Sequence, residues 1–149
     1  SPIKRAFGQG LEAALELGDL ESADRMLDLI GQARPGVVTP LLRAQAARFG
    51  ARLSAIRGNH DSVEAGFVAA IEGFRGVGVL FELGVTLVEL AEWLAEQGRQ
   101  EEARGFGLES SSLFEQLGAR PWLDRVARLL GTHSSTRLAT STPLVSAAP

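Results

Sequence analysis

Apolar residues recur along this chain with the spacing of an α-helix rather than that of a β-strand. In three long segments they stand three or four positions apart, so each segment presents one apolar face. These faces consist of Phe7, Leu11, Ala14 and Leu15, then Leu41, Ala44, Ala47, Ala51, Ala55 and Ile56, then Leu80, Leu83, Leu87, Leu90, Ala91 and Leu94. No segment alternates apolar and polar residues over any length, so the pattern predicts an all-α fold without a sheet.

A glycine follows each of these segments, and the three glycines are forty residues apart. They are Gly18, Gly58 and Gly98. Glycine takes the left-handed conformation at a helix end more easily than other residues, so each glycine predicts a turn. A second helix-like run follows each turn, at residues 20–32, 61–75 and 101–117. A repeat of this length indicates antiparallel helical hairpins that stack on one another.

Helix-breaking residues set the boundaries of the predicted hairpins. Pro35-Gly36 interrupts the chain, Thr39-Pro40 is a typical N-cap with a first helical residue, and Gly76 with Gly78 marks the second break. We therefore predict hairpins at residues 3–32, 40–75 and 79–117. Pro121 begins a short segment with an apolar face, which we predict as a capping helix over 121–130.

The change in composition after Gly131 predicts the end of the domain. Residues 132–149 are rich in Ser, Thr, Ala and Pro, with few side chains that could be buried. We therefore predict one helical domain over residues 1–131 and a flexible tail over 132–149.

Small residues five positions after each turn glycine make the pattern resemble the tetratricopeptide repeat. They are Ala23, Val63 and Ala103. The resemblance covers residues 3–131 and implies stacked hairpins that form a superhelix, with the first helix of each hairpin on a concave, partner-binding surface. In that family a large apolar residue follows four positions after the small one; Leu27 and Phe67 agree with this, whereas Gly107 departs from it.

A shorter stretch at residues 113–123 resembles a second group of proteins. Its sequence, Leu-Phe-Glu-Gln-Leu-Gly-Ala-Arg-Pro-Trp-Leu, is similar to the last repeat of large bacterial signalling proteins. Those proteins join an ATPase core and a helical-repeat region to an adenylate cyclase or a LuxR-type DNA-binding domain. In the LuxR-type proteins a helix-turn-helix domain follows, whereas a Ser/Thr-rich segment follows here. The resemblance implies that this chain is part of a multidomain bacterial signalling or transcription-regulating protein.

The tetratricopeptide resemblance also implies which side chains line the groove. The expected positions are Glu12, Glu16, Arg48, Arg52, Ile56, Val88, Glu92 and Glu96. The groove would then be acidic, basic and acidic in successive hairpins. Arg48 and Arg52 either pair with neighbouring carboxylates and stabilise the stacking, or contact a ligand. The Lys and Asn residues of the family's best-known peptide clamp are absent, so we do not expect a chaperone-tail clamp.

Two tryptophans are candidates for aromatic anchors. Trp93 lies at the edge of the apolar face of its helix, and Trp122 follows Pro121 at the start of the predicted capping helix. Tryptophan is enriched where binding energy is concentrated in protein interfaces, so both residues could hold a partner or a second copy of the chain. The alternative is that both pack between hairpins.

Composition excludes several functional classes. The net charge of −3 and the pI of about 5.4 argue against a direct nucleic-acid partner. The longest apolar stretch, 77–94, is interrupted by Glu82, Glu89 and Glu92, which argues against a membrane span. The chain has no Cys, and its start lacks the apolar region of a signal peptide. We therefore expect a cytoplasmic protein.

No motif predicts covalent chemistry, a metal or a cofactor. Gly76 and Gly78 lack the third glycine and the preceding strand of a dinucleotide-binding loop. His60 follows a turn glycine and is expected to be exposed at a helix start, and Ser110 has no nearby His to activate it. We therefore expect no catalytic residue, no metal site and no cofactor.

The leading functional hypothesis is a protein-protein interaction scaffold that binds protein or peptide segments or other domains of the same protein. The alternative is a regulatory domain that senses a small effector between hairpins and controls a linked cyclase or DNA-binding domain. We also expect the apolar face of the first helix to allow self-association as a homodimer.

Overall fold

The computed structural model describes residues 2–34 and 36–139, with side chains described over 5–34 and 36–131. Within these residues the chain forms helices and no strand, so the predicted all-α class is confirmed. The helices are α1 (Pro2–Glu16), α2 (Leu20–Gly31), α3 (Pro40–Ile56), α4 (His60–Val77), α5 (Leu80–Glu96), α6 (Gln100–Leu117) and α7 (Arg120–Ala139).

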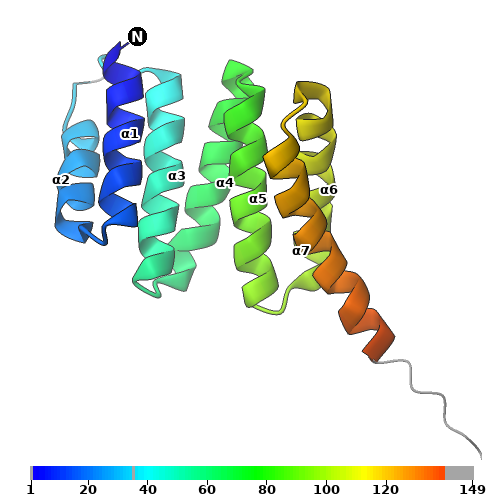
Figure 1. Ribbon diagram of the computed structural model, residues 1–149. Helices are drawn as coiled ribbons and strands as arrows, with labels where there is room; N and C mark the ends of the chain where they lie inside the picture. Colours follow the sequence, from blue (N-terminus) through cyan, green and yellow to red (C-terminus); the bar gives the residue numbers. More distant parts are fainter. Residues whose placement is uncertain (1, 35, 140–149) are drawn as a thin grey trace, which may run out of the picture.

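Consecutive helices run antiparallel and pack as three hairpins, α1 with α2, α3 with α4 and α5 with α6 (Figure 1). Helix α7 packs against α6 and α5 at the end of the stack. Helices α1, α3, α5 and α7 lie side by side on the face turned to the viewer, and α4 and α6 lie behind them (Figure 1). We call the surface formed by α1, α3, α5 and α7 the odd-helix face.

The three turns inside the hairpins have the same backbone geometry. The residue after each turn glycine donates its N–H to a carbonyl five residues earlier. These bonds join Asp19 to Ala14 (2.8 Å), Asn59 to Ser54 (2.9 Å) and Arg99 to Leu94 (2.9 Å). The turn glycines have φ angles of 71°, 72° and 79°, so the left-handed conformation predicted for them is confirmed.

Side chains cap two of the helices that follow a break. The carboxylate of Asp19 accepts a hydrogen bond from the Ser22 N–H (3.1 Å), and the hydroxyl of Thr39 accepts one from the Leu42 N–H (3.2 Å). The bonds from Ser22 also lower the pKa of Asp19. The N-cap predicted at Thr39 is therefore confirmed, and Pro40 occupies the first turn behind it.

Helix α5 lies at the centre of the fold. Nine of its residues are buried, because neighbouring helices cover it on several sides. Leu87, Leu90 and Leu94 belong to the largest apolar core, which also contains Phe67 and Phe74 of α4. A second core joins α1 and α2 to α3, and a third joins α5 and α6 to α7. The hairpins therefore share their cores with their neighbours, as a stacked repeat requires.

Helices α3 and α4 approach closely because small residues face each other along their contact. A Cβ atom added at Gly66 would lie 2.9 Å from the Cβ of Ala51, and one added at Gly73 would lie 2.7 Å from the Cβ of Ala44. Only glycine fits at these two positions without moving the partner helix.

Two helices extend beyond their predicted ends. Helix α4 includes Gly76 and ends at Val77, and Gly78 closes it with a φ of 81°. Helix α7 continues past Leu130 to Ala139, so residues 132–139 of the predicted tail are helical. Gly131 disfavours a helix by about 1 kcal/mol relative to Ala, which does not end a helix by itself. The remainder of the predicted tail, 140–149, lies outside the described residues.

Candidate functional site

Ion pairs join α1, α3 and α5 across the odd-helix face. Arg52 of α3 donates to Glu12 of α1, with 2.7 Å between Nη1 and Oε2. On its other side Arg52 lies 3.2 Å from Glu89 of α5, measured from Nε to Oε2. Arg48, one turn earlier on α3, donates to the other carboxylate oxygen of Glu89. The two arginines therefore connect one helix from each of the three hairpins through ion pairs.

Burial and charge together set the ionisation of this cluster. The side chains of Glu89 and Arg48 are only 11% and 15% exposed. Burial lowers the pKa of Arg52, but the hydrogen bond to Glu12 and the negative charges of Glu89, Glu12 and Glu16 outweigh it and raise the pKa. Burial likewise raises the pKa of Glu12, and the Arg52 bond with the nearby positive charges reverses this and lowers it. Glu12 and Arg52 are therefore both charged near neutral pH.

A further ion pair extends the cluster to α7. The guanidinium of Arg125 donates to both oxygens of the Glu92 carboxylate on α5, at 2.5 and 3.1 Å. The same guanidinium lies over the Trp122 ring, 4.9 Å from its centroid. The Glu92 bond raises the pKa of Arg125. Acidic and basic side chains thus alternate from α1 to α7 across this face. We call these six residues the ion-pair network: Glu12, Arg48, Arg52, Glu89, Glu92 and Arg125.

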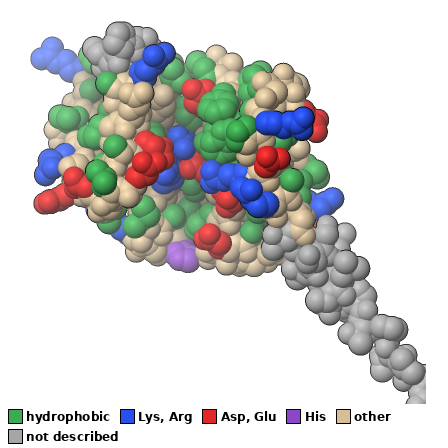
Figure 2. Space-filling model, viewed as in Figure 1, with side chains coloured by type: hydrophobic (Ala, Val, Ile, Leu, Met, Phe, Trp, Pro, Cys, Tyr) green, Lys and Arg blue, Asp and Glu red, His purple; other side chains and the backbone are tan. Residues whose placement is uncertain are grey.

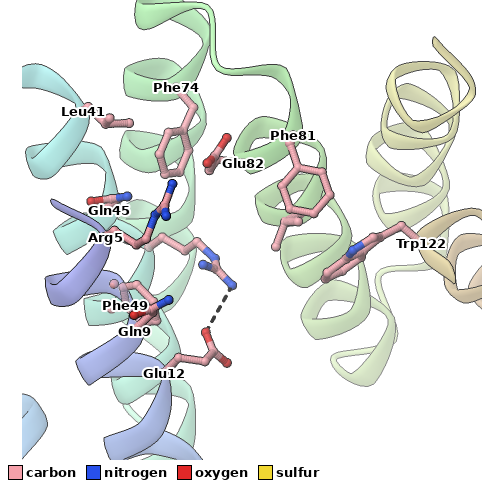
Figure 3. A pocket seen from close by; sticks show the side chains of 13 residues that line it. Arg5, Gln9, Glu12, Leu41, Gln45, Phe49, Phe74, Phe81, Glu82 and Trp122 are labelled. Atoms are coloured by element: carbon pink, nitrogen blue, oxygen red, sulfur yellow. Dashed lines mark ion pairs between the residues drawn. The ribbon is translucent and has the colours of Figure 1, made fainter. Parts of the chain in front are cut away.

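An open cleft of about 530 Å³ lies beside this network (Figure 3). Its walls come from α1, α3, α4, α5 and α7. Phe49 and Phe74 are buried at its base, whereas Phe81 is 44% exposed. Phe81 and Trp122 belong to an aromatic cluster in which their rings meet edge to face at 6.0 Å. The cleft is lined by Arg5, Gly8, Gln9, Glu12, Leu41, Gln45, Arg48, Phe49, Phe74, Phe81, Glu82, Val85 and Trp122. We call it the aromatic cleft.

Two shallower hollows contain the rest of the network. One, of about 390 Å³, is lined by Ile56, Phe67, Trp93 and Glu96 together with Arg52, Ala55, Glu89, Glu92 and Arg125. The other, of about 350 Å³, is lined by Glu92, Glu96, Arg125, Arg128 and Leu129. Charged and apolar side chains are mixed over this face of the molecule (Figure 2). The ion-pair network therefore separates an aromatic cleft from hollows that are partly acidic.

The structure brings most of the predicted groove residues to this face. Glu12, Arg48, Arg52 and Glu92 are in the ion-pair network, and Ile56 and Glu96 line the hollow of about 390 Å³. Glu16 is exposed at the end of α1, and its negative charge acts on Arg52.

The prediction that Val88 contacts a partner is wrong. Val88 is completely buried in the core that joins α5 to α6 and α7. The tetratricopeptide resemblance implied an open surface for Val88, but α7 packs over that side of α5 together with Val126. Its chain neighbour Glu89, which was not among the predicted groove residues, faces the arginines instead.

The two tryptophans have different surroundings. Trp122 stacks on Phe114, with ring centroids 5.5 Å apart, and also lines the aromatic cleft. Trp93 meets the His60 ring edge to face at 6.0 Å and lines the hollow of about 390 Å³. Both rings are partly buried. Trp93 packs between the second and third hairpins and Trp122 packs between α7 and the third hairpin, and each still offers a surface to a ligand.

The polar residues weighed as chemical candidates take structural positions. His60 is exposed at the start of α4, and Ser110 is buried with its hydroxyl donating to the Gly107 carbonyl at 2.8 Å. Within the described residues, no group of three or more His, Cys, Asp or Glu could hold a metal ion. His133 lies among residues whose side chains are not described.

Sequence reasoning missed Arg125 and most of the aromatic cleft. Arg125 lies in α7, outside the forty-residue repeat, so the spacing gave no sign that it pairs with Glu92. Phe81 could have been found from its place at the start of α5, on the side opposite the buried leucines. Arg5, Gln45 and Glu82 gave no signal, because only the packing of several helices brings them together.

Comparisons with known proteins leave the family open. No model of a known protein family matches the chain, and no curated protein matches it either. The packing is that of a helical-hairpin repeat. None of the helices within residues 2–34 and 36–139 combines the length and the hydrophobicity needed to cross a bilayer.

Proposed function

We propose that this chain is a non-catalytic interaction domain that holds a segment of another protein, or another domain of its own protein, along the odd-helix face. The observation that carries the proposal is the pair of hollowed surfaces on either side of the ion-pair network. The network holds three acidic and three basic side chains, so its charges largely cancel. Apolar side chains beside it, such as Phe81 and Ile56, then supply most of the binding energy.

The charges outside the network indicate the chemistry of the partner. Glu96 lines both smaller hollows and is exposed, and Glu16 is exposed at the end of α1. A segment with an apolar side chain followed by Lys or Arg would therefore complement this part of the face.

A peptide-display selection on the whole chain tests the proposal. Peptides selected on the natural sequence should bind Ile56→Asp at least about tenfold more weakly, because the new carboxylate lies among apolar and acidic groups. Leu29→Asp is the matched control, since Leu29 is 70% exposed on α2 and lines none of the three hollows. Failure to select any peptide, or equal weakening by both variants, contradicts docking on this face. Arg52→Glu is less suitable, because it would place three carboxylates together.

We also propose, from the resemblance of residues 113–123, that the chain belongs to a multidomain bacterial signalling or transcription-regulating protein. These residues span the end of α6 and the start of α7. Their Phe114 and Trp122 stack on each other and fix α7 to the third hairpin. The structural importance of this motif supports the resemblance, and the test is the arrangement of domains in the full-length protein.

A second candidate function is the binding of a small effector that regulates a linked domain. The aromatic cleft favours it, because its volume of about 530 Å³ is within the range of small-molecule sites, roughly 300–1,000 Å³. Its lining is largely apolar, with a few polar groups that could orient a ligand.

A further inference from the structure

We infer that the aromatic cleft binds a free aromatic amino acid, with its ring among the aromatic side chains and its α-carboxylate and α-amino groups between Arg5 and Glu82. This inference rests on the effector-binding candidate; the docking proposal uses the same cleft, and the experiments below distinguish the two. Two observations carry it: the aromatic lining, and two opposite charges that have no partners among the residues the structure describes.

The lining provides a place for an aromatic ring. Phe49 and Phe74 form the base of the cleft, and Phe81 and Trp122 stand on the opposite side (Figure 3). Phe81 keeps 44% of its surface exposed although it lies in the first turn of α5, in which nine residues are buried. An added ring would cover Phe81 and could meet its neighbours edge to face, which adds roughly 0.5–1.5 kcal/mol per pair beyond burial.

Two charged side chains point into the same part of this cleft. In Figure 3 the guanidinium of Arg5 and the carboxylate of Glu82 lie beside the Phe74 ring, and they come from α1 and α5. They do not pair with each other, and neither side chain has an ion-pair or hydrogen-bond partner among the described residues. The other arginine of the cleft, Arg48, is already held by Glu89 and Glu12. Arg5 is therefore the cation available to a ligand.

The spacing of charges in an amino acid suits this arrangement. Its carboxylate and ammonium groups are attached to one carbon atom, so they can lie between two opposite charges that do not pair with each other. Arg5 would donate to the α-carboxylate, and Glu82 would accept from the α-ammonium group. A ligand with a single charge would leave one of the two side chains without a partner.

Nuclear magnetic resonance of the ¹⁵N-labelled whole chain tests the inference. The probes are L-phenylalanine, N-acetyl-L-phenylalanine, L-phenylalanine amide and N-acetyl-L-phenylalanine amide. L-phenylalanine should shift the indole N–H signal of Trp122. The indole N–H signal of Trp93 should not shift, because Trp93 lies in a different hollow. Each singly blocked probe should bind about tenfold more weakly, because it loses one charged hydrogen-bond partner. The doubly blocked probe should bind most weakly.

Two variants assign the groups. Arg5→Gln should bind L-phenylalanine and its amide equally, and Glu82→Gln should bind L-phenylalanine and its N-acetyl form equally. Arg43→Gln is the control, because Arg43 is exposed on α3 outside the cleft and should leave all four affinities unchanged.

Two results would overturn the inference. The first is no shift of Trp122 with any probe up to its solubility limit. The second is equal affinity for L-phenylalanine and the doubly blocked probe. This would mean that the cleft binds the ring and that the charged groups of the ligand do not contribute. The second result resembles the binding of a side chain within a peptide, so it would leave the docking proposal standing. Failure of the peptide selection alone would leave this inference standing.

Discussion

Glu12 of α1 and Arg52 of α3 occupy equivalent positions of adjacent repeats, and their side chains form an ion pair with 2.7 Å between Oε2 and Nη1. The next equivalent position, forty residues later, is Glu92. Glu92 pairs with Arg125 of α7, and Arg52 pairs on that side with Glu89. The charges at this repeat position alternate in sign. Together with Glu89 and Arg125 they form ion pairs that join every helix of the odd-helix face.

Glu89→Gln should destabilise the fold by about 1–3 kcal/mol, because the largely buried Glu89 carboxylate is shared by Arg48 and Arg52. Urea denaturation measures the change. Glu72→Gln is the control, since Glu72 is exposed on α4, and it should have little effect. Arg48→Met should lower the unfolding free energy less in the Glu89→Gln variant than in the natural sequence. An equal decrease in both would mean that the two side chains are not coupled.

Gly73→Ala and Gly76→Ala should change stability in opposite directions, although both glycines lie in α4. At Gly73 the new Cβ would lie 2.7 Å from the Cβ of Ala44, so the substitution should cost about 1–3 kcal/mol. At Gly76 nothing lies within 4 Å, so alanine should stabilise the helix by about 0.5–1 kcal/mol. Melting temperatures of the two variants decide the point, and a stabilising Gly73→Ala would refute the close approach of α3 and α4.

Acid should weaken the ion-pair network through Glu12. The pKa of Glu12 is lowered in the folded state from its ordinary value of 4.5, so folding favours the ionised form. Its contribution to stability is therefore complete above pH 4.5 and is lost as the pH falls through the lower folded-state pKa. Glu12→Gln should make the unfolding free energy less dependent on pH below 4.5 and should leave the dependence above about pH 6 unchanged. Urea denaturation at pH values between 3 and 7 tests this. The prediction is contradicted if the unfolding free energy of Glu12→Gln depends on pH below 4.5 as strongly as that of the natural sequence.

Val126→Ala should destabilise the chain by about 1–3 kcal/mol, because Val126 is completely buried between α7 and the third hairpin. Val77→Ala, at the exposed end of α4, is the matched control and should change stability little. If Val126→Ala instead leaves stability unchanged while amide exchange in α7 is already fast, α7 is not part of the cooperative fold.

Local sequence patterns determined the helices and the turns of this protein. The apolar period fixes which segments form helices, and glycines spaced by forty residues fix where the hairpins turn, because both signals depend on neighbouring residues alone. The tetratricopeptide resemblance implied that Glu12, Arg52 and Glu92 lie on one face. The sequence left open whether the arginines pair within the chain or contact a ligand; in the structure both are paired with carboxylates.

Tertiary packing decided which of these side chains remain accessible. Val88 and Glu89 are adjacent in the sequence, but α7 covers the first and leaves the second facing α3. The aromatic cleft likewise exists because residues from five helices meet, among them Arg5, Phe49, Phe74, Glu82 and Trp122. A repeat pattern describes what each hairpin shares with the next. The cleft, the Arg125 pair and the burial of Val88 all depend on α7, which belongs to no repeat, and the distances between helices are set by packing rather than by local spacing.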